Sequence, residues 1–212
     1  MNSTMTSGSV NKKEFWEEIY QNRSLNESGW YEPIPQSSLK LIESSGISKK
    51  DSIIDIGGGD SLLVDHLLSK GFENITVLDI SEKAIEKAKI RLGSSADHVN
   101  WICSDILNFE VNSTYKLWHD RACLHFLTRD AELELYQKKL SQGLAKGGSM
   151  ILGAFSKSGP KKCSGLLIRQ YDSTDLTRFF SEEFELMENF ETVHITPSKS
   201  TQNYVFCRFK KK

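Results

Sequence analysis

The chain has 212 residues, 38% of them hydrophobic and 26% charged, with a formal net charge of −1 at pH 7. This length fits one domain with a substantial core, and the balanced charge excludes a strongly basic nucleic-acid-binding surface. No apolar stretch approaches the roughly 20 residues of a membrane span, and the four cysteines form no Cys-x-x-Cys pair. We therefore expect a cytoplasmic monomer without bound metal and without nucleic-acid or membrane partners.

The N-terminal quarter of the chain precedes the first predicted strand. Residues 1–11 are polar and rich in Ser and Thr, which predicts a disordered leader. Apolar spacing then predicts helices over residues 12–20 and 37–45, separated by a segment that contains two prolines. We assign residues 12–50 to an N-terminal helical lid and residues 51–212 to the core domain.

From Asp51 onward, strand patterns and helix patterns alternate. This alternation predicts a mostly parallel sheet with helices on both faces. No helical pattern separates the last two strands, so we expect them to form an antiparallel hairpin at the sheet edge. The predicted strands are residues 52–56, 75–79, 98–102, 115–119, 148–155, 185–194 and 203–209, and the predicted helices are residues 60–70, 81–92, 130–142 and 173–180.

A glycine-rich turn, Asp55-Ile56-Gly57-Gly58-Gly59, lies between the first of these strands and a helical pattern. Such a turn is how α/β proteins bind nucleotide-like ligands, because glycine lets the backbone approach the ligand closely. Leu62 stands where the dinucleotide fingerprint has its third glycine, and no Gly-Lys-Ser/Thr follows. The turn therefore predicts a ligand without a pyrophosphate, and the Asp55 carboxylate suits an amino or sulfonium cation.

The next two strands also end in acids. Asp79 lies 24 positions after Asp55 and is placed to bind ribose hydroxyls. Asp105, within Ser104-Asp105-Ile106, is placed to accept a hydrogen bond from an adenine amine. The carboxyl ends of neighbouring parallel strands meet at the edge where ligands of open α/β folds bind.

In these three motifs the chain resembles the class I S-adenosylmethionine-dependent methyltransferases. The resemblance implies a seven-stranded, Rossmann-like sheet of order 3-2-1-4-5-7-6, with strand seven antiparallel and helices on both faces. It also implies S-adenosyl-L-methionine as cofactor. A non-catalytic binding module of the same fold stays open, whereas the missing third glycine disfavours an NAD-dependent oxidoreductase. The implied cofactor contacts in these motifs are Asp55, Gly57, Gly59, Asp79, Ile80, Ser104, Asp105 and Ile106.

The end of the fourth strand resembles two groups within this family. Asp120-Arg121 is similar to the Asp-Arg-Gly-x-Leu of thiopurine methyltransferase-like enzymes and to the Asp-Lys-Gly-Thr-Leu of lysine methyltransferases acting on elongation factor 1A and citrate synthase. The chain has Ala122 in place of the glycine. Asp120 is implied to contact the cofactor, and the aromatic residues Trp16, Tyr20 and Trp30 are implied to cover it. Packing of these aromatic residues on the core remains an alternative.

Two residues of the same segment are candidates for catalysis. His125 is the predicted general base, with His119 next, because imidazole titrates near neutrality. Arg121 is expected to orient an anionic acceptor or the cofactor carboxylate. We expect methyl transfer to a small-molecule acceptor, with sulfur or nitrogen favoured. The alternative is a protein-lysine N-methyltransferase, and the sequence does not name the acceptor.

Overall fold

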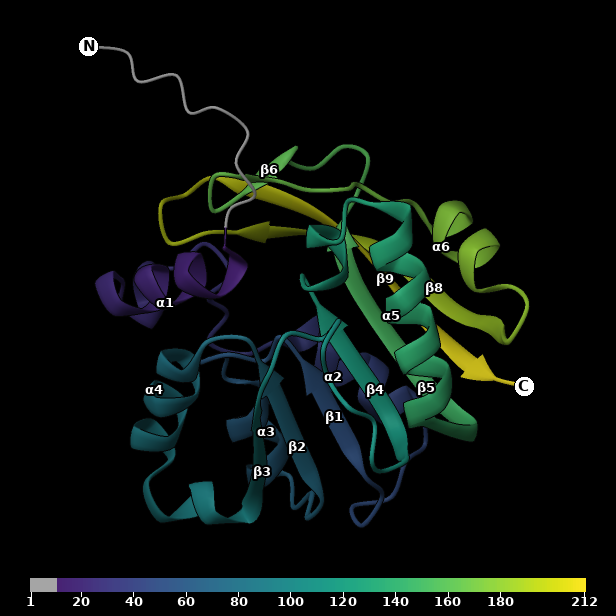
Figure 1. The fold of residues 1–212 in the computed structure, drawn as a ribbon, viewed down its shortest axis with the longest axis horizontal. Helices are drawn as coiled ribbons and strands as arrows, with labels where there is room; N and C mark the ends of the chain where they lie inside the picture. The colour runs from purple at the N-terminus through teal and green to yellow at the C-terminus, as the bar shows by residue number, and fades with distance from the viewer. Residues whose placement is uncertain (1–10) are drawn as a thin grey trace.

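The computed structural model describes residues 11–212 as one mixed sheet flanked by helices (Figure 1). The predicted leader lies outside these residues except for Asn11, whose side chain caps the first helix. The helices are α1 (Lys12–Asn22), α2 (Gln36–Ser44), α3 (Leu63–Ser69), α4 (Glu82–Leu92), α5 (Asp130–Gly143) and α6 (Ser173–Phe180), with short 3₁₀ turns at Leu25–Glu27, Gly93–His98 and Leu124–Phe126. The strands are β1 (Ile53–Ile56), β2 (Ile75–Asp79), β3 (Val99–Cys103), β4 (Tyr115–Arg121), β5 (Leu144–Phe155), β6 (Lys162–Cys163), β7 (Leu166–Leu167), β8 (Phe184–Ile195) and β9 (Thr201–Lys211).

The main sheet has the strand order β3-β2-β1-β4-β5-β9-β8. Strands β1 to β5 pair in parallel, whereas β9 runs antiparallel to both of its neighbours, β5 and β8. The predicted topology, including the edge hairpin, is therefore confirmed. In such a sheet β1 and β4 are neighbours, and the space outside their carboxyl ends is where a ligand binds.

Two layers of apolar side chains, one on each face, hold the helices against the sheet. On one face, α5 and α6 bury residues such as Leu140 and Phe180 against β4, β5 and β9. On the other face, α2 buries residues such as Leu41 against β4 and β5, and α3 buries residues such as Leu67 against β2. Each fully buried aliphatic or aromatic side chain stabilises this packing by about 1.5–3 kcal/mol, so the strand ends are held on a rigid support.

The predicted helices and strands agree with the observed ones to within three residues at each end, except at the start of β5. β5 begins at Leu144 instead of residue 148, because pairing with β4 continues past an irregularity in register. Gly147, with a φ of +69°, takes the left-handed conformation within this stretch. The small β6–β7 hairpin was not predicted, because two-residue strands leave no periodic pattern in a sequence.

α1 lies across the carboxyl edge of the sheet, beside α4 (Figure 1). The Glu17 carboxylate accepts hydrogen bonds from the Glu82 backbone at 2.8 Å and from the Ser81 hydroxyl at 3.0 Å. Burial alone would raise the pKa of Glu17, but these donors outweigh it and lower that pKa. Lys12 pairs with Glu132 of α5 at 2.9 Å. These contacts fix α1 to the start of α4 and to α5. The division of the chain into a lid and a core domain at residue 50 stays a prediction.

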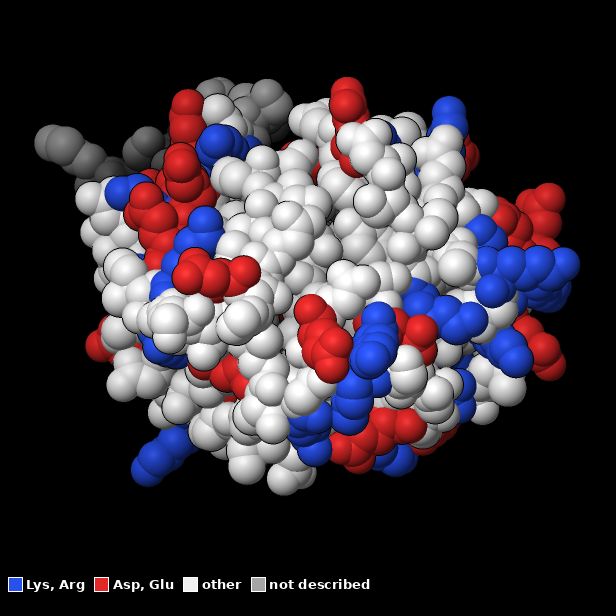
Figure 2. All heavy atoms as spheres, turned by 90° about the horizontal axis from the view of Figure 1, so that it is seen from below, with Lys and Arg blue, Asp and Glu red and all other residues white. Residues whose placement is uncertain are grey.

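Positive and negative side chains are interspersed over the face in Figure 2, where neither sign covers a broad area. This distribution agrees with the net charge of −1. Among the described residues, no helix combines the length and apolar character needed to cross a membrane.

Candidate ligand-binding site

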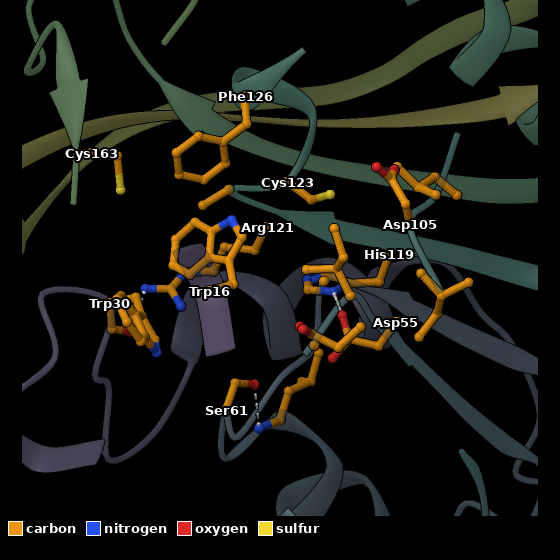
Figure 3. A pocket seen from close by; sticks show the side chains of 18 of the residues that line it. Trp16, Trp30, Asp55, Ser61, Asp105, His119, Arg121, Cys123, Phe126 and Cys163 are labelled. Carbon is orange, nitrogen blue, oxygen red and sulfur yellow. Dashed lines mark hydrogen bonds and ion pairs between the residues drawn. The ribbon is translucent and has the colours of Figure 1, made fainter. Parts of the chain in front are cut away.

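A pocket opens at the carboxyl edge of the sheet, between the ends of β1, β2 and β4 and beneath α1 (Figure 3). Most of the predicted site residues line it, namely Trp16, Tyr20, Trp30, Asp55, Gly57, Asp79, Ile80, Ser104, Asp105, Ile106 and Arg121. The lining also includes His119, the second candidate base, and residues that were not predicted as contacts, among them Ser38, Gly58, Phe126 and Cys163. Gly59, Asp120 and His125 are not among the lining residues.

The glycine turn is packed so tightly that side chains would not fit. Gly57 has a φ of +65°, and a Cβ atom there would lie 2.9 Å from the Cβ of Cys123. At Gly58 a Cβ atom would lie 2.6 Å from Asp55. Gly59, with a φ of +52°, packs against the hydroxyl of Tyr20, which a Cβ atom would approach to 2.5 Å. Gly59 thus shapes the pocket by admitting Tyr20 instead of lining the pocket itself.

Three buried acids, Asp55, Asp60 and Asp79, lie around this turn, with exposed fractions of 2–5%. Burial, together with the charges of Asp60 and Asp55, raises the pKa of Asp79 to about 7, although the Ser81 backbone N–H opposes the change. Burial likewise raises the pKa of Asp60, whose Oδ1 has no hydrogen-bond partner in residues 11–212. A group of incompletely neutralised carboxylates favours a cationic or hydroxyl-bearing ligand.

Asp55 is held by a chain of hydrogen bonds. Its Oδ1 lies 2.6 Å from His119 Nδ1, and His119 Nε2 lies 2.9 Å from the Ser38 hydroxyl (Figure 3). Asp55 and His119 are direct neighbours in the β1–β4 register, so their side chains emerge on the same face of the sheet. Of the two candidate histidines, His119 is the one that reaches the pocket.

The β3 end of the pocket is also shaped by a carboxylate. Asp105 Oδ1 accepts a hydrogen bond from the Leu107 backbone at 2.9 Å, which closes the turn after β3. The Ser104 backbone donates to the Asp79 carbonyl at 2.8 Å, so the ends of β2 and β3 are fixed together. This end of the pocket, with Asp79, Ser104 and Asp105, is called the acidic end below.

Aromatic side chains cover the pocket. Trp16 lies 6.0 Å from Trp30 and 5.2 Å from Phe126, and Tyr20 lies 5.6 Å from Trp30, each between ring centroids. Burial raises the pKa of Tyr20 well above its usual value, with the charges of Asp79 and Asp60 adding to this effect. The rings therefore pack on one another and line the pocket, and their role as a cover over the cofactor stays a prediction.

Arg121 carries the positive charge at the opposite end of the pocket, beside Trp30 and Cys163 (Figure 3). Its Nη2 donates to the Trp30 carbonyl at 3.0 Å and lies 3.4 Å from the Glu32 carboxylate. Its Nε is buried without a hydrogen-bond partner in the part of the chain that the structure describes. The end formed by Trp30, Arg121, Phe126 and Cys163 is called the aromatic end below.

The predicted contact of Asp120 with the cofactor is not supported, because Asp120 does not line the pocket. Its side chain is fully buried on the far face of β4, where its carboxylate accepts hydrogen bonds from the backbone of Cys123 and Leu124 and from the Tyr136 hydroxyl, at 2.8–3.1 Å. Asp120 therefore shapes the turn after β4 and does not face the ligand. Within this turn Ala122 has a φ of +67°, a left-handed conformation that explains why the resembled motifs have glycine there.

His125 also lies away from the predicted place. Its ring is fully buried between the rings of Phe126 and Phe155, at centroid distances of 4.6 and 4.7 Å. Burial, with a contribution from the charge of Arg121, lowers the pKa of His125 to about 3. A ring outside the pocket with so low a pKa is a poor proton acceptor at neutral pH, so the geometry does not support the predicted base role.

Residues 53–148 match the family model described as "Methyltransferase domain". Among curated proteins, the eEF1A lysine and N-terminal methyltransferase of Mus musculus is 28% identical over 141 residues, which are 65% of this chain and 20% of that protein. The chain thus spans about a fifth of the length of this relative.

Solved structures with a similar fold cover nearly the whole chain. The N-methyltransferase NodS from Bradyrhizobium japonicum WM9, in complex with S-adenosyl-L-homocysteine, has a TM-score of 0.72 at 20% identity and covers 92% of this chain and 97% of its own. A Burkholderia thailandensis 1,6-didemethyltoxoflavin-N1-methyltransferase, with 1,6-didemethyltoxoflavin and S-adenosylhomocysteine bound, has a TM-score of 0.70 at 14% identity. It covers 96% of this chain and 85% of its own. At these identities the similarity concerns the fold.

Proposed function

Because the chain belongs to the class I S-adenosylmethionine-dependent methyltransferases, we propose that it transfers the donor's methyl group to a small-molecule acceptor bound at the aromatic end of the pocket. The predicted family, fold and cofactor are confirmed by the domain match and the related structures. The acceptor and the roles of individual residues are the proposal. The observation that supports it most directly is the buried position of Arg121 beside Trp30.

The residues of the pocket fit S-adenosylmethionine. The glycine turn lets Cys123, Asp55 and Tyr20 pack directly against its backbone. The acids around it suit a ligand with an ammonium and a sulfonium. Asp79 would accept hydrogen bonds from the ribose, Asp105 would face the adenine, and Asp55, held by His119, would face the amino group. The aromatic rings of Trp16 and Tyr20 would lie over the cation.

Bound S-adenosylmethionine supplies an electrophilic methyl group. The chain's own contribution is then to align the acceptor and to exclude water, and alignment alone can lower the barrier by about 7–11 kcal/mol. The cover of Trp16, Trp30 and Phe126 closes the pocket on the acceptor side. His125 is buried elsewhere, and both ring nitrogens of His119 are already bonded to Asp55 and Ser38. An acceptor that arrives deprotonated, such as a thiolate, therefore fits this site best.

Arg121 favours an acceptor with an anionic group over a lysine side chain. A lysine ammonium enters the site protonated at neutral pH, and the guanidinium would repel it. A carboxylate or thiolate would instead gain a charge-assisted hydrogen bond from a donor such as Arg121 Nε, which lacks a partner among the described residues. The S-adenosylhomocysteine complex of the toxoflavin enzyme is an example of a small acceptor on a similar fold.

The alternative, a protein-lysine N-methyltransferase, rests on a different observation. A relative that aligns with 65% of this chain, at 28% identity, is an eEF1A lysine and N-terminal methyltransferase. The rings of Trp16, Tyr20 and Trp30 also suit the alkyl chain of a lysine. This proposal would require a neutral lysine amine beside Arg121.

One labelling experiment separates the two proposals. The chain is incubated with S-adenosylmethionine labelled in its methyl group and with a whole-cell extract, and the label is then measured in the small-molecule and protein fractions. We expect label in the small-molecule fraction that is absent with Asp79→Ala. Arg121→Met should reduce this transfer about 10–100-fold, and by more than it weakens S-adenosylhomocysteine binding, whereas Arg121→Lys should reduce it less. Label confined to protein bands would refute the small-molecule proposal.

A further inference from the structure

The loop of residues 28–35 carries Trp30 into the pocket, and two strands of the sheet hold this loop from below. From β4, Arg121 Nη2 donates to the Trp30 carbonyl at 3.0 Å. From β8, His194 Nε2 lies 2.9 Å from the Gly29 carbonyl. Glu32 of the same loop lies between both side chains, 3.4 Å from Arg121 Nη2 and 3.3 Å from His194 Nδ1.

The surroundings of His194 determine its charge. Both of its ring nitrogens face oxygen atoms that only accept hydrogen bonds, a backbone carbonyl on Nε2 and a carboxylate on Nδ1. A neutral imidazole carries one N–H, so it would turn a lone pair toward one of these two oxygens. The imidazolium carries an N–H on each nitrogen and satisfies both.

The aromatic and charged groups near His194 are Tyr204, Arg121 and Glu32. The Tyr204 ring of β9 lies beneath the network, 6.4 Å from the His194 ring and 5.5 Å from the Arg121 guanidinium. Arg121 opposes a second positive charge, but Glu32 lies between the two cations and compensates for one of them. Burial would raise the pKa of Glu32, yet His194, Arg121 and His119 outweigh it and lower that pKa, so Glu32 is ionised.

We propose that Glu32 and His194 are positioning residues: protonated His194 holds the 28–35 loop, and with it Trp30 and Arg121, in the arrangement that closes the pocket. The loop has a second histidine contact, His66 Nε2 to the Pro33 carbonyl at 2.9 Å. A neutral ring satisfies this single contact, so His66 requires no charge. The proposal concerns closure over the donor and does not depend on which acceptor the protein uses.

Closure should therefore weaken at a pH at which the His194 ring keeps only one N–H, because a lone pair then faces one of the two oxygen atoms. The test compares the Kd for S-adenosylhomocysteine of His194→Gln with that of the unsubstituted chain, by calorimetry from pH 5.5 to 8.5. Asp79 also titrates in this range, near pH 7, but it does so in both proteins and cancels in their ratio. We expect the ratio of Kd values to be about 10 at pH 5.5 and to approach 1 at pH 8.5.

Two further variants make the result specific. Glu32→Gln should give a similar pH-dependent ratio, because the amide removes the charge that requires protonated His194. His98→Gln, at an exposed position, should give a ratio of 1 throughout. A ratio for His194→Gln that does not change with pH would overturn the proposal and leave a structural role for His194. If the unsubstituted chain failed to bind S-adenosylhomocysteine at any pH, both this proposal and the proposed function would be refuted.

Discussion

Asp79→Asn should stabilise the ligand-free chain at pH 8 and, in the same protein, weaken its binding of S-adenosylhomocysteine. Asp79 is 5% exposed and lies close to the carboxylates of Asp55 and Asp60. Burial, the larger cause, and these two charges raise its pKa from 3.8 to about 7. An ionised Asp79 is therefore unfavourable for the free protein, and its presence in the pocket needs a ligand to explain it.

The size and sign of the stability change follow from this pKa. Between about pH 4 and 7 the folded chain keeps a proton on Asp79 that the unfolded chain has released, so the free energy of unfolding falls as the pH rises. Above pH 7 the free energy of unfolding is lower by roughly 4 kcal/mol, because each unit by which the pKa is raised corresponds to about 1.4 kcal/mol. Asparagine does not ionise, and its amide oxygen can still accept the hydrogen bond from the Ser81 backbone.

Binding should change in the opposite direction. The ionised carboxylate is a stronger acceptor for ribose hydroxyls than an amide, so Asp79→Asn should lose about 1–3 kcal/mol of affinity at pH 8. Urea denaturation at pH 4.5 and 8 measures stability, and calorimetry measures the Kd. Asp97→Asn, at an exposed position, is the matched control and should change neither quantity. A variant that is less stable at pH 8 and binds S-adenosylhomocysteine normally would refute both the stability argument and the ribose role.

Three further substitutions test how the pocket is supported. Glu17→Gln should lower the free energy of unfolding by about 1–2 kcal/mol and speed hydrogen exchange at the start of α4, because the carboxylate that bonds α1 to α4 is lost. The control Glu18→Gln, at an exposed position, should behave like the unsubstituted chain. Gly57→Ala should weaken S-adenosylhomocysteine binding by more than tenfold, because its Cβ atom would clash with Cys123. The control Gly147→Ala has a similar positive φ but open space around it, so it should affect stability alone. Ala122→Gly should raise the free energy of unfolding by about 0.5–1 kcal/mol in urea titrations by relieving a left-handed alanine, and a loss of stability would contradict this.

The parts of the fold and site that the sequence predicted are those whose signals are local. Each strand of the sheet has its own apolar pattern, and Asp55, Asp79 and Asp105 lie at or just beyond the carboxyl ends of β1, β2 and β3. Once the strands are parallel, residues at their carboxyl ends meet at one edge without further information. The acidic end of the pocket was therefore predictable residue by residue.

The failures near β4 have a common physical cause. Side chains alternate along a strand, so His119 and Arg121 emerge on the face of Asp55 and Ser38, whereas Asp120 emerges on the face of α5. Adjacency in the sequence suggested that Asp120 and Arg121 face the same ligand, but their side chains lie on opposite faces of β4. His125 lies beyond the strand in a 3₁₀ turn, where alternation no longer applies, and its direction depends on packing against Phe155, 30 positions away.

The two ends of the pocket are consequently under different constraints. The acidic end is built from strand ends that the sheet itself fixes, so the binding of the donor is tied to the fold. The aromatic end is assembled from α1, the 28–35 loop, the turn after β4 and the β6–β7 hairpin, which are separate segments. Substitution of Trp30 or Cys163 can alter the space around the proposed acceptor position with little effect on the sheet. Acceptor specificity can therefore change among proteins of this fold without loss of donor binding, which is why the sequence indicated the donor and left the acceptor open.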